Sequence, residues 1–459
     1  MTVQKGGLLL VAVVGAEFML QLDGTIVAVA LPDLQRDLHL ATGELTWVVN
    51  AFLLAFGGGL LVAGRVGDLI GHRRAFLAGI ALLALGSAAA GLAPAIGWLA
   101  AGRVVQGAGA ALAGPAGLAL LSLSFEGERR DRALGVYSTV TGLAAGAGML
   151  LGGVLTWAGD WRWTILVNVP IGLLVLVLSA RLLPRPPAPV EGAAGRGRLD
   201  IIGAALSAAG TTALVYGLVR VADAGWRDAV AVAVLACAVA ALAALPVTQR
   251  RVASPLLPPR VFADRAKAGA FAVLVLLAFV LTGFLFFLTL LLQRAMGLDP
   301  LRTGLAFLPF GAALMVGART APALFRRLRP EFLAVTGLLL GGGALLLLAR
   351  VGPDSGYLTA VAGPEVLLGL AAGLTIVPLN VIVLTRTDPA DAGVTSGLLQ
   401  ATLAIGGALG LAVLLGVATG RAGVADAFLG AAVVAGLAAL LAAAAWFIPS
   451  RPQRAGAAS

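Results

Sequence analysis

The sequence predicts an all-α membrane protein with about fourteen transmembrane helices. Of its 459 residues, 60% are hydrophobic and only 12% are charged, and the mean hydropathy is +1.00. A soluble protein could not bury this much apolar surface, because single cores stop growing at about 250–300 residues. Apolar runs of about 20 residues, the length that crosses a bilayer as a helix, recur from end to end. No stretch has the character of an enzyme domain, so we expect no enzymatic activity.

The expected spans are joined by polar loops. They cover about 7–31, 45–63, 75–93, 97–121, 134–156, 164–183, 201–219, 229–246, 268–292, 303–320, 333–349, 358–384, 393–418 and 425–448. Two polar stretches, 184–198 and 249–267, divide the spans into six, two and six. We therefore predict an N-terminal six-helix bundle over 1–183, a linker with two extra transmembrane helices over 184–267, a C-terminal six-helix bundle over 268–450 and a tail over 451–459.

The positive charges fix an expected orientation. A net charge of +10 might suggest nucleic acid as a partner, but the charges are placed as in a membrane protein. With the N-terminus in the cytoplasm, about 22 of the 32 Lys and Arg fall in cytoplasmic loops and tails, as the positive-inside rule requires. We expect a multi-pass protein of the cell membrane with both termini and the tail in the cytoplasm, and the lipid bilayer rather than nucleic acid as its partner.

Cysteine and histidine are too scarce for metal or disulfide chemistry. The one cysteine, Cys237, lies inside a span, and the two histidines, His39 and His72, lie in predicted loops. An intrachain disulfide needs two cysteines, and metal sites need several such ligands. We expect no metal and no cofactor.

The loop between the second and third spans carries an unusual set of residues. Gly64 and Gly71 let helix ends approach closely and let the chain turn. Asp68 is placed to meet either a helix N-terminus or a neighbouring arginine. Arg73 and Arg74 hold the loop on the cytoplasmic side. An ordinary positive-inside loop is the alternative interpretation, but it has no need of this arrangement.

The first span contains two acids, which are expensive in hydrocarbon when charged and unpaired. Asp23 is a candidate proton carrier. The alternative interpretation is that Asp23 is an acid at a helix end that faces the water outside. Glu17 precedes it by six residues, about 120° round the helix. Glu17 is a second proton site, a contact for cationic substrates, or a group neutralised by local hydrogen bonds.

The fourth span contains Arg103, which cannot readily lose its charge and therefore needs an acid, carbonyls or water. Gln106, three residues on, shares its helix face. We favour Arg103 as the group that biases protonation of a nearby first-helix acid, and a purely structural anchor is the alternative. The fifth span offers a flat, glycine-rich face for tight helix packing, formed by Gly142, Gly146, Gly148, Gly152 and Gly153.

These motifs resemble those of a known family. The pattern G-x-x-x-D-x-x-G-x-R-R resembles the signature loop of the major facilitator superfamily. The stretch L-D-x-T-I-V-x-V-A-L-P around Asp23 resembles the first-helix signature of its fourteen-span drug:proton antiporters, with Ala28 in place of the usual Asn. R-x-x-Q-G-x-G at Arg103 resembles the fourth-helix motif, whose arginine is implicated in proton coupling. The fifth-helix glycines resemble the antiporter motif, with Met149 at its usual proline.

The resemblance covers essentially the whole chain and implies the major facilitator fold, with two parallel halves and a substrate path between them. It implies proton-coupled efflux of a small amphipathic drug or antibiotic, driven by the proton gradient, by a monomer. The alternatives are a dedicated exporter of one metabolite, an importer, and a non-transporting sensor or scaffold.

A drug pocket would use aromatic faces and a few polar groups. The candidates are Trp47, Asn50, Phe56, Gln106, Tyr137, Phe284, Phe287, Gln293, Glu365, Asn380 and Gln400, and helix packing is the alternative role for most of them. Glu365 lies near the outer end of its span, where we expect water to reach it.

Overall fold

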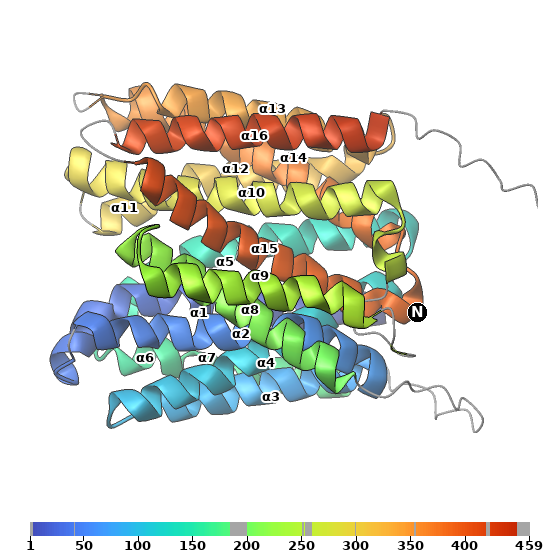
Figure 1. Cartoon of the computed structure of the whole chain (residues 1–459), viewed down its shortest axis with the longest axis horizontal. Helices are drawn as coiled ribbons and strands as arrows, with labels where there is room; N and C mark the ends of the chain where they lie inside the picture. Colours follow the sequence, from blue (N-terminus) through green and yellow to red (C-terminus); the bar gives the residue numbers. More distant parts are fainter. Residues whose placement is uncertain are drawn as a thin grey trace, which may run out of the picture.

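A computed structural model describes residues 3–40, 42–183, 200–249, 252, 259–298, 300–352, 355–418 and 423–447. All the regular secondary structure of these residues is helical. Figure 1 shows the long helices running roughly along one common axis, as helices that cross a membrane together must.

The helices follow the predicted spans closely. The first group is α1 (Val3–Asp37), α2 (Thr42–Ile70), α3 (His72–Gly91), α4 (Ile96–Ser124), α5 (Gly127–Ala158), α6 (Arg162–Leu166) and α7 (Asn168–Leu182). Next come α8 (Ile201–Ala224), α9 (Ala229–Gln249) and the short turn η1 (Pro259–Phe262). The last group is α10 (Arg265–Leu290), η2 (Leu291–Ala295), α11 (Pro300–Ala306), α12 (Leu308–Leu324), α13 (Pro330–Leu348), η3 (Tyr357–Val361), α14 (Ala362–Thr385), η4 (Pro389–Asp391), α15 (Ala392–Val417) and α16 (Gly423–Phe447).

Thirteen segments of the described residues are long and apolar enough to cross a membrane. They coincide with thirteen of the predicted spans. The remaining prediction, 134–156, falls in α5, a helix of 32 residues that carries charged residues in its first turns. The described part of the chain therefore has the helix content of a polytopic membrane protein.

Two predicted spans are broken helices. The sixth span divides into α6 and α7 at Val167, and the tenth divides into α11 and α12 at Phe307. Pro170 and Pro309 follow these breaks in the first turn of α7 and of α12, where a missing N–H costs no intrahelical hydrogen bond. From the sequence we expected continuous spans, because apolar composition alone does not register such breaks.

Glycines set how closely the helices of the first group approach. An added Cβ at Gly79 in α3 would lie 2.5 Å from the backbone nitrogen of Ala113 in α4. A Cβ at Gly109 in α4 would lie 2.5 Å from the nitrogen of Leu83 in α3. Backbone-to-backbone contact of this kind is how helices associate where burial from water supplies little driving force.

The extra pair α8 and α9 lies beside both groups. Helix α8 contacts α2 and α15, and its Thr212 hydroxyl donates to the Leu54 carbonyl of α2 at 3.4 Å. The side chain of Asp200 caps α8 by accepting from the Gly203 N–H at 2.9 Å, and it also accepts from Gln249 at the end of α9 at 2.5 Å. The pair therefore forms a closed hairpin attached to the bundle through α8.

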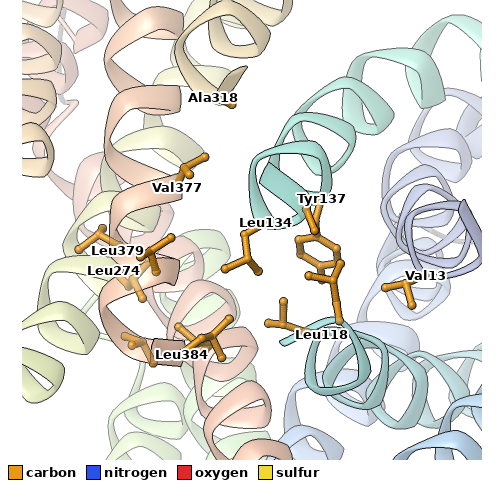
Figure 2. Close-up of a cluster of buried hydrophobic side chains, with 14 of the residues drawn as sticks. Val13, Leu118, Leu134, Tyr137, Leu274, Ala318, Val377, Leu379 and Leu384 are labelled. Atoms are coloured by element: carbon orange, nitrogen blue, oxygen red, sulfur yellow. The ribbon is translucent and has the colours of Figure 1, made fainter. Parts of the chain in front are cut away.

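A large hydrophobic cluster joins the first and last groups of helices. Figure 2 shows Leu118 of α4 and Leu134 and Tyr137 of α5 on one side, and Leu274 of α10 and Leu379 of α14 on the other. The two groups therefore share one apolar interior.

Candidate functional site

Asp23 lies at the centre of a buried polar network. Its side chain is fully buried, and its Oδ2 accepts from Arg103 Nη1 at 2.6 Å. Its Oδ1 accepts from Gln106 Nε2 at 3.0 Å and from Asn168 Nδ2 at 2.6 Å. The carboxylate therefore has three donors from two other helices, and it does not face outside water.

The guanidinium of Arg103 also has several hydrogen-bond partners. Besides Asp23, its guanidinium donates to the Val48 carbonyl at 2.9 Å and to Gln106 Oε1 at 3.1 Å. Its Cζ lies 4.5 Å from the centre of the Phe52 ring, a cation–π distance. Arg103 therefore meets an acid and a carbonyl, two of the three kinds of partner that the sequence left open. Its role in biasing protonation of Asp23 stays a prediction. Because the pair is buried and complete, removing either partner alone leaves an uncompensated charge.

Two members of this network were not among the predicted site residues. Asn168 is fully buried at the start of α7, and the break at Val167 places it beside Asp23. Ser87 of α3 accepts from Gln106 Nε2 at 2.7 Å. The sequence signal for Asn168 was an isolated amide two residues before a proline in an apolar span. Ser87 gave no signal, since helical serines commonly bond their own backbone.

Glu17 belongs to a separate network that faces α5. It is 3% exposed and accepts from Gln21 at 2.8 Å, from the Tyr137 hydroxyl at 2.7 Å and from Thr141 at 3.2 Å. The two acids of α1 therefore point to different helices, as their spacing predicts. A space of about 160 Å³ adjoins Glu17 and Tyr137.

The Glu17 network crosses between the two helix groups. Gln400 of α15 donates to the Tyr137 hydroxyl at 3.3 Å. Asn380 of α14 donates to the Ser138 hydroxyl at 3.3 Å. Three of the predicted pocket residues, Tyr137, Asn380 and Gln400, thus meet at the interface between the groups, although they are far apart in sequence.

Removing the Tyr137 hydroxyl is expected to destabilise the protein by about 1–3 kcal/mol, the cost of leaving buried polar groups unsatisfied. Tyr137→Phe would take one donor from Glu17 and the acceptor of Gln400. Chemical denaturation in detergent measures the effect. Thr336→Val is the control, because that hydroxyl bonds only a carbonyl of its own exposed helix turn. An equal, small effect of both changes would show that the Tyr137 link contributes nothing.

The last turns of α2 join the two helix groups at one end of the bundle, called here the Asp68 end. The sequence predicted a loop over residues 64–74, but Gly64 and Asp68 lie in α2, Arg73 and Arg74 lie in α3, and only Gly71 separates the two helices. Asp68 Oδ1 accepts from the Gly393 N–H at 2.9 Å, and Oδ2 accepts from the Val394 N–H at 3.2 Å. These are N–H groups at the start of α15, so the acid meets a helix N-terminus, one of its two predicted partners. A Cβ at Gly64 would lie 2.5 Å from the Gly393 carbonyl oxygen.

Gly71 and the first turn of α3 complete this contact region. Gly71 has φ 93°, in the region that favours glycine. Arg73 donates to the carbonyls of Ala180 at 2.8 Å and Leu183 at 3.2 Å, at the end of α7. A cation at a helix C-terminus is favoured by the helix dipole. Arg74 is exposed.

Ion pairs reinforce the Asp68 end. Arg326 pairs with Glu128 across the two groups at 3.3 Å. Arg260 forms a bidentate pair with Asp391, at 2.7 and 2.8 Å, directly before α15. Both arginines are largely exposed, so the pairs fix geometry more than they add stability. The Asp68 end of this conformation is therefore closed.

At the opposite end, Asp37 joins α1 to α6. It accepts from the Trp161 indole at 3.0 Å and from Arg162 at 2.9 Å. The hydrogen bond from Trp161, followed by that from Arg162, lowers the pKa of the exposed Asp37 carboxyl below its usual value. The Trp161–Arg162 pair thus anchors the first group where α6 begins.

The remaining predicted pocket residues are dispersed. Phe56 stacks on Phe52 with ring centres 5.8 Å apart, Asn50 is half-buried, and Trp47 is 48% exposed. Phe284 and Phe287 are fully buried in a second apolar cluster, and Phe284 packs on Phe310 at 5.1 Å. Gln293 is exposed in η2. The aromatic candidates of the last group therefore pack the helix interior in this conformation.

One expectation was wrong. Glu365 was predicted to be wetted near the outer end of its span, but its exposed fraction is 0%. Its Oε2 lies 3.1 Å from the Tyr357 hydroxyl oxygen, a hydrogen-bond distance. Position along an apolar span does not reveal whether a neighbouring turn covers the side chain, and here η3 does.

The glycine face of α5 is partly described. A Cβ at Gly148 would overlap the Thr25 side chain of α1 and lie 3.1 Å from the Leu22 carbonyl oxygen. Gly152 is buried. Gly142, Gly146 and Gly153 lie outside the residues whose surroundings the structure describes. At Gly148, the flat face therefore brings α5 against α1.

Comparison with known proteins identifies the class of protein. The signature of the Major Facilitator Superfamily matches residues 13–411. The chain therefore belongs to this superfamily, and it is a multi-pass membrane transporter.

The relatives narrow the class further. The chain is 40% identical to a puromycin resistance protein of Streptomyces alboniger, over 90% of this chain and 81% of that protein. It is also 40% identical to a cephamycin export protein of Amycolatopsis lactamdurans, over 91% and 88%. A tetracenomycin C resistance and export protein of Streptomyces glaucescens is 35% identical, over 88% and 74%. These relatives are antibiotic resistance and export transporters, which places the chain in the drug:proton antiporter group.

Solved structures confirm the fold. A human organic anion transporter matches with a TM-score of 0.71 at 16% identity, covering 95% of this chain and 99% of that chain. A proton:xylose symporter matches with a TM-score of 0.70 at 12% identity, covering 98% and 97%. The helices described above therefore form the major facilitator fold.

Proposed function

We propose that this transporter exports a small amphipathic drug or antibiotic in exchange for protons. The observation that carries the proposal is the buried Asp23–Arg103 pair, in a chain whose relatives are antibiotic export and resistance proteins. Acids inside membrane helices are costly, and where they occur they commonly mark the path of a substrate or a proton.

The chemistry of the pair favours Asp23 as the proton site. Arg103 does not release its proton at ordinary pH, so a proton entering this network binds the carboxylate. Protonation cancels the charge that holds Arg103 Nη1 at 2.6 Å, and it loosens α1 from α4 and α7. Loss of the proton restores the contact. The proton thereby favours one arrangement of the first helix group over another.

The conformational change of alternating access is the opening and closing of the Asp68 end. The positive-inside rule puts the arginine-rich loops of this end in the cytoplasm, so this conformation is closed toward the cytoplasm. The side chains around Glu17 and Tyr137 leave no cavity large enough for a drug-sized molecule in this conformation. A drug-sized substrate therefore requires the two groups to move apart, and the Asp68–Gly393 contact must break when the cytoplasmic side opens.

A dedicated exporter of one endogenous metabolite is the second candidate. It is favoured by relatives whose names each specify one compound, such as puromycin or cephamycin. Broad efflux predicts transport of many unrelated amphipathic compounds, whereas a dedicated exporter predicts one chemical class.

Purified protein in liposomes tests the proposal. We expect an imposed pH gradient to drive accumulation of several antibiotics of unrelated structure, and a protonophore to abolish it. A matched set of liposomes without protein controls for passive leak. Transport of a single class would establish the dedicated exporter. Accumulation that a protonophore leaves unchanged would refute proton coupling.

A further inference from the structure

Glu365 occupies a site that the Asp23 mechanism does not use. It lies in the first turn of α14, is fully buried, and has no ion-pair partner among the described residues. Its Oε2 lies 3.1 Å from the Tyr357 hydroxyl, and its Oε1 has no hydrogen-bond partner. A buried carboxylate whose neighbouring donors are the Tyr357 hydroxyl and the Phe310 N–H, with no cation beside it among the described residues, is strongly disfavoured.

The hydrogen count at Tyr357 favours a protonated Glu365. The same hydroxyl lies 2.8 Å from the Ala306 carbonyl oxygen, which can only accept. A phenol has one hydrogen and cannot donate to both oxygens. Both contacts are satisfied together only when Tyr357 donates to Ala306 and a protonated Glu365 donates to Tyr357.

These contacts lie at the break between α11 and α12. Ala306 is the last residue of α11, and its carbonyl is satisfied by Tyr357 rather than by α12. The N–H of Phe310, in the first turn of α12, faces the Glu365 carboxyl and is one of the donors that a helix start leaves unpaired. Tyr357 and Glu365 therefore contact the backbone groups that the break between α11 and α12 leaves without helix partners.

The break is coupled to the other helix group, because α11 contacts α5. Figure 1 shows α11 at the left-hand end of the bundle. Helices α5, α10, α12, α13 and α15 also pack on α14. Among the described residues, Tyr357 is the one titratable or charged side chain that any packed element brings into contact with Glu365.

We propose that Glu365 is a second proton-binding carboxyl, and that its proton holds α11 in place through Tyr357. When the proton leaves, the phenolic hydrogen turns to the carboxylate, because hydrogen bonds to charged groups are stronger. The Ala306 carbonyl then loses its donor, and the buried charge has no counterion. Water can hydrate both the Ala306 carbonyl and the Glu365 carboxylate when α11 moves away. Raising the pH therefore displaces α11 from α5.

Spin-label distances test this without any transport. Labels replace Leu305 of α11 and Val154 of α5, both exposed, in a Cys237→Ser background. We expect a pH rise to shift the wild-type distances to longer values. Glu365→Gln keeps a donor toward Tyr357, so its distances are expected to stay short at every pH. Glu126→Gln, at an exposed acid, is the matched control and keeps the wild-type response.

Further variants separate this proposal from the proposed antiport, on which its role in transport rests. Asp23→Asn is expected to keep the pH-dependent shift of α11, and Tyr357→Phe is expected to lose it. Infrared spectra at neutral pH should show a protonated-carboxyl carbonyl band in wild type that weakens in Glu365→Gln and persists in Glu126→Gln. A wild-type response retained in Glu365→Gln, a response lost in Asp23→Asn, or no pH response at all would overturn the proposal. A Glu365→Gln protein that does not fold leaves Tyr357→Phe to decide.

Discussion

Replacing Asp23 with asparagine is expected to abolish substrate accumulation driven by a pH gradient. Asparagine has a similar shape and can still accept from Arg103, but it cannot bind and release a proton. One charge crossing 100 mV is worth ~2.3 kcal/mol, and each tenfold step in concentration costs ~1.4 kcal/mol. One proton at that driving force sustains a roughly fortyfold gradient, and the variant should lose it entirely. Radiolabelled substrate uptake into liposomes measures the loss.

A second variant is needed, because Asp23→Asn leaves the buried Arg103 without its charge partner. Removing one partner of a buried ion pair costs about 3–5 kcal/mol, so Asp23→Asn is also expected to lower stability. Asp23→Leu combined with Arg103→Leu removes both charges and should recover stability without recovering transport. Asp33→Asn, on the same helix but partly exposed, is the matched control. Gradient-driven transport by a stable, doubly substituted protein would refute the role assigned to the pair.

Substituting Gly393 with alanine is expected to prevent the Asp68 end from closing and to reduce transport to background. The new Cβ would overlap the Gly64 carbonyl oxygen and lie 2.5 Å from Asp68 Oδ1. Neither atom can retreat easily, because Gly64 is helix backbone and Asp68 is held by two N–H groups of α15. The packing within each helix group is untouched, so the protein should fold.

A buried reporter beside Gly393 measures the change. Ser396 is fully buried in α15, so Ser396→Cys in a Cys237→Ser background should react slowly with a thiol reagent in the closed state. We expect Gly393→Ala to make it react faster. Gly343→Ala is the control, because its Cβ would meet nothing within 4 Å. Full transport activity in Gly393→Ala would show that this close approach is dispensable.

The sequence was sufficient to predict the fold and to single out Asp23 and Arg103, but it left open which partner Arg103 meets. Apolar runs of bilayer length leave only the helix as a spanning structure, and Asp23 and Arg103 stand out because charges in such runs need partners. The glycines of this segment were predicted to let helix ends approach, and Asp68 was predicted to meet either a helix N-terminus or a neighbouring arginine. The partner helix, α15, was not predictable from these residues, because it lies more than 300 residues away.

The rest of the site depends on tertiary packing. Asn168 reaches Asp23 only because the sixth span breaks at Val167, and Gln400 meets Tyr137 only where the two helix groups touch. Phe284 resembles a pocket aromatic in sequence, but it packs against Phe310 inside the last group. Glu365 was expected in water and is buried under η3 instead. Contacts between distant segments carry no local signal that one sequence can reveal.

The central claim, that Asp23 couples substrate export to proton movement, is tested most directly by following substrate and lumenal pH together in the same liposomes. An outward substrate gradient imposed on wild-type protein should drive protons in the opposite direction, at a fixed ratio to the substrate moved. Asp23→Asn should still exchange labelled for unlabelled substrate at equilibrium, with no change in lumenal pH. Proton movement by Asp23→Asn at the wild-type ratio would contradict the account.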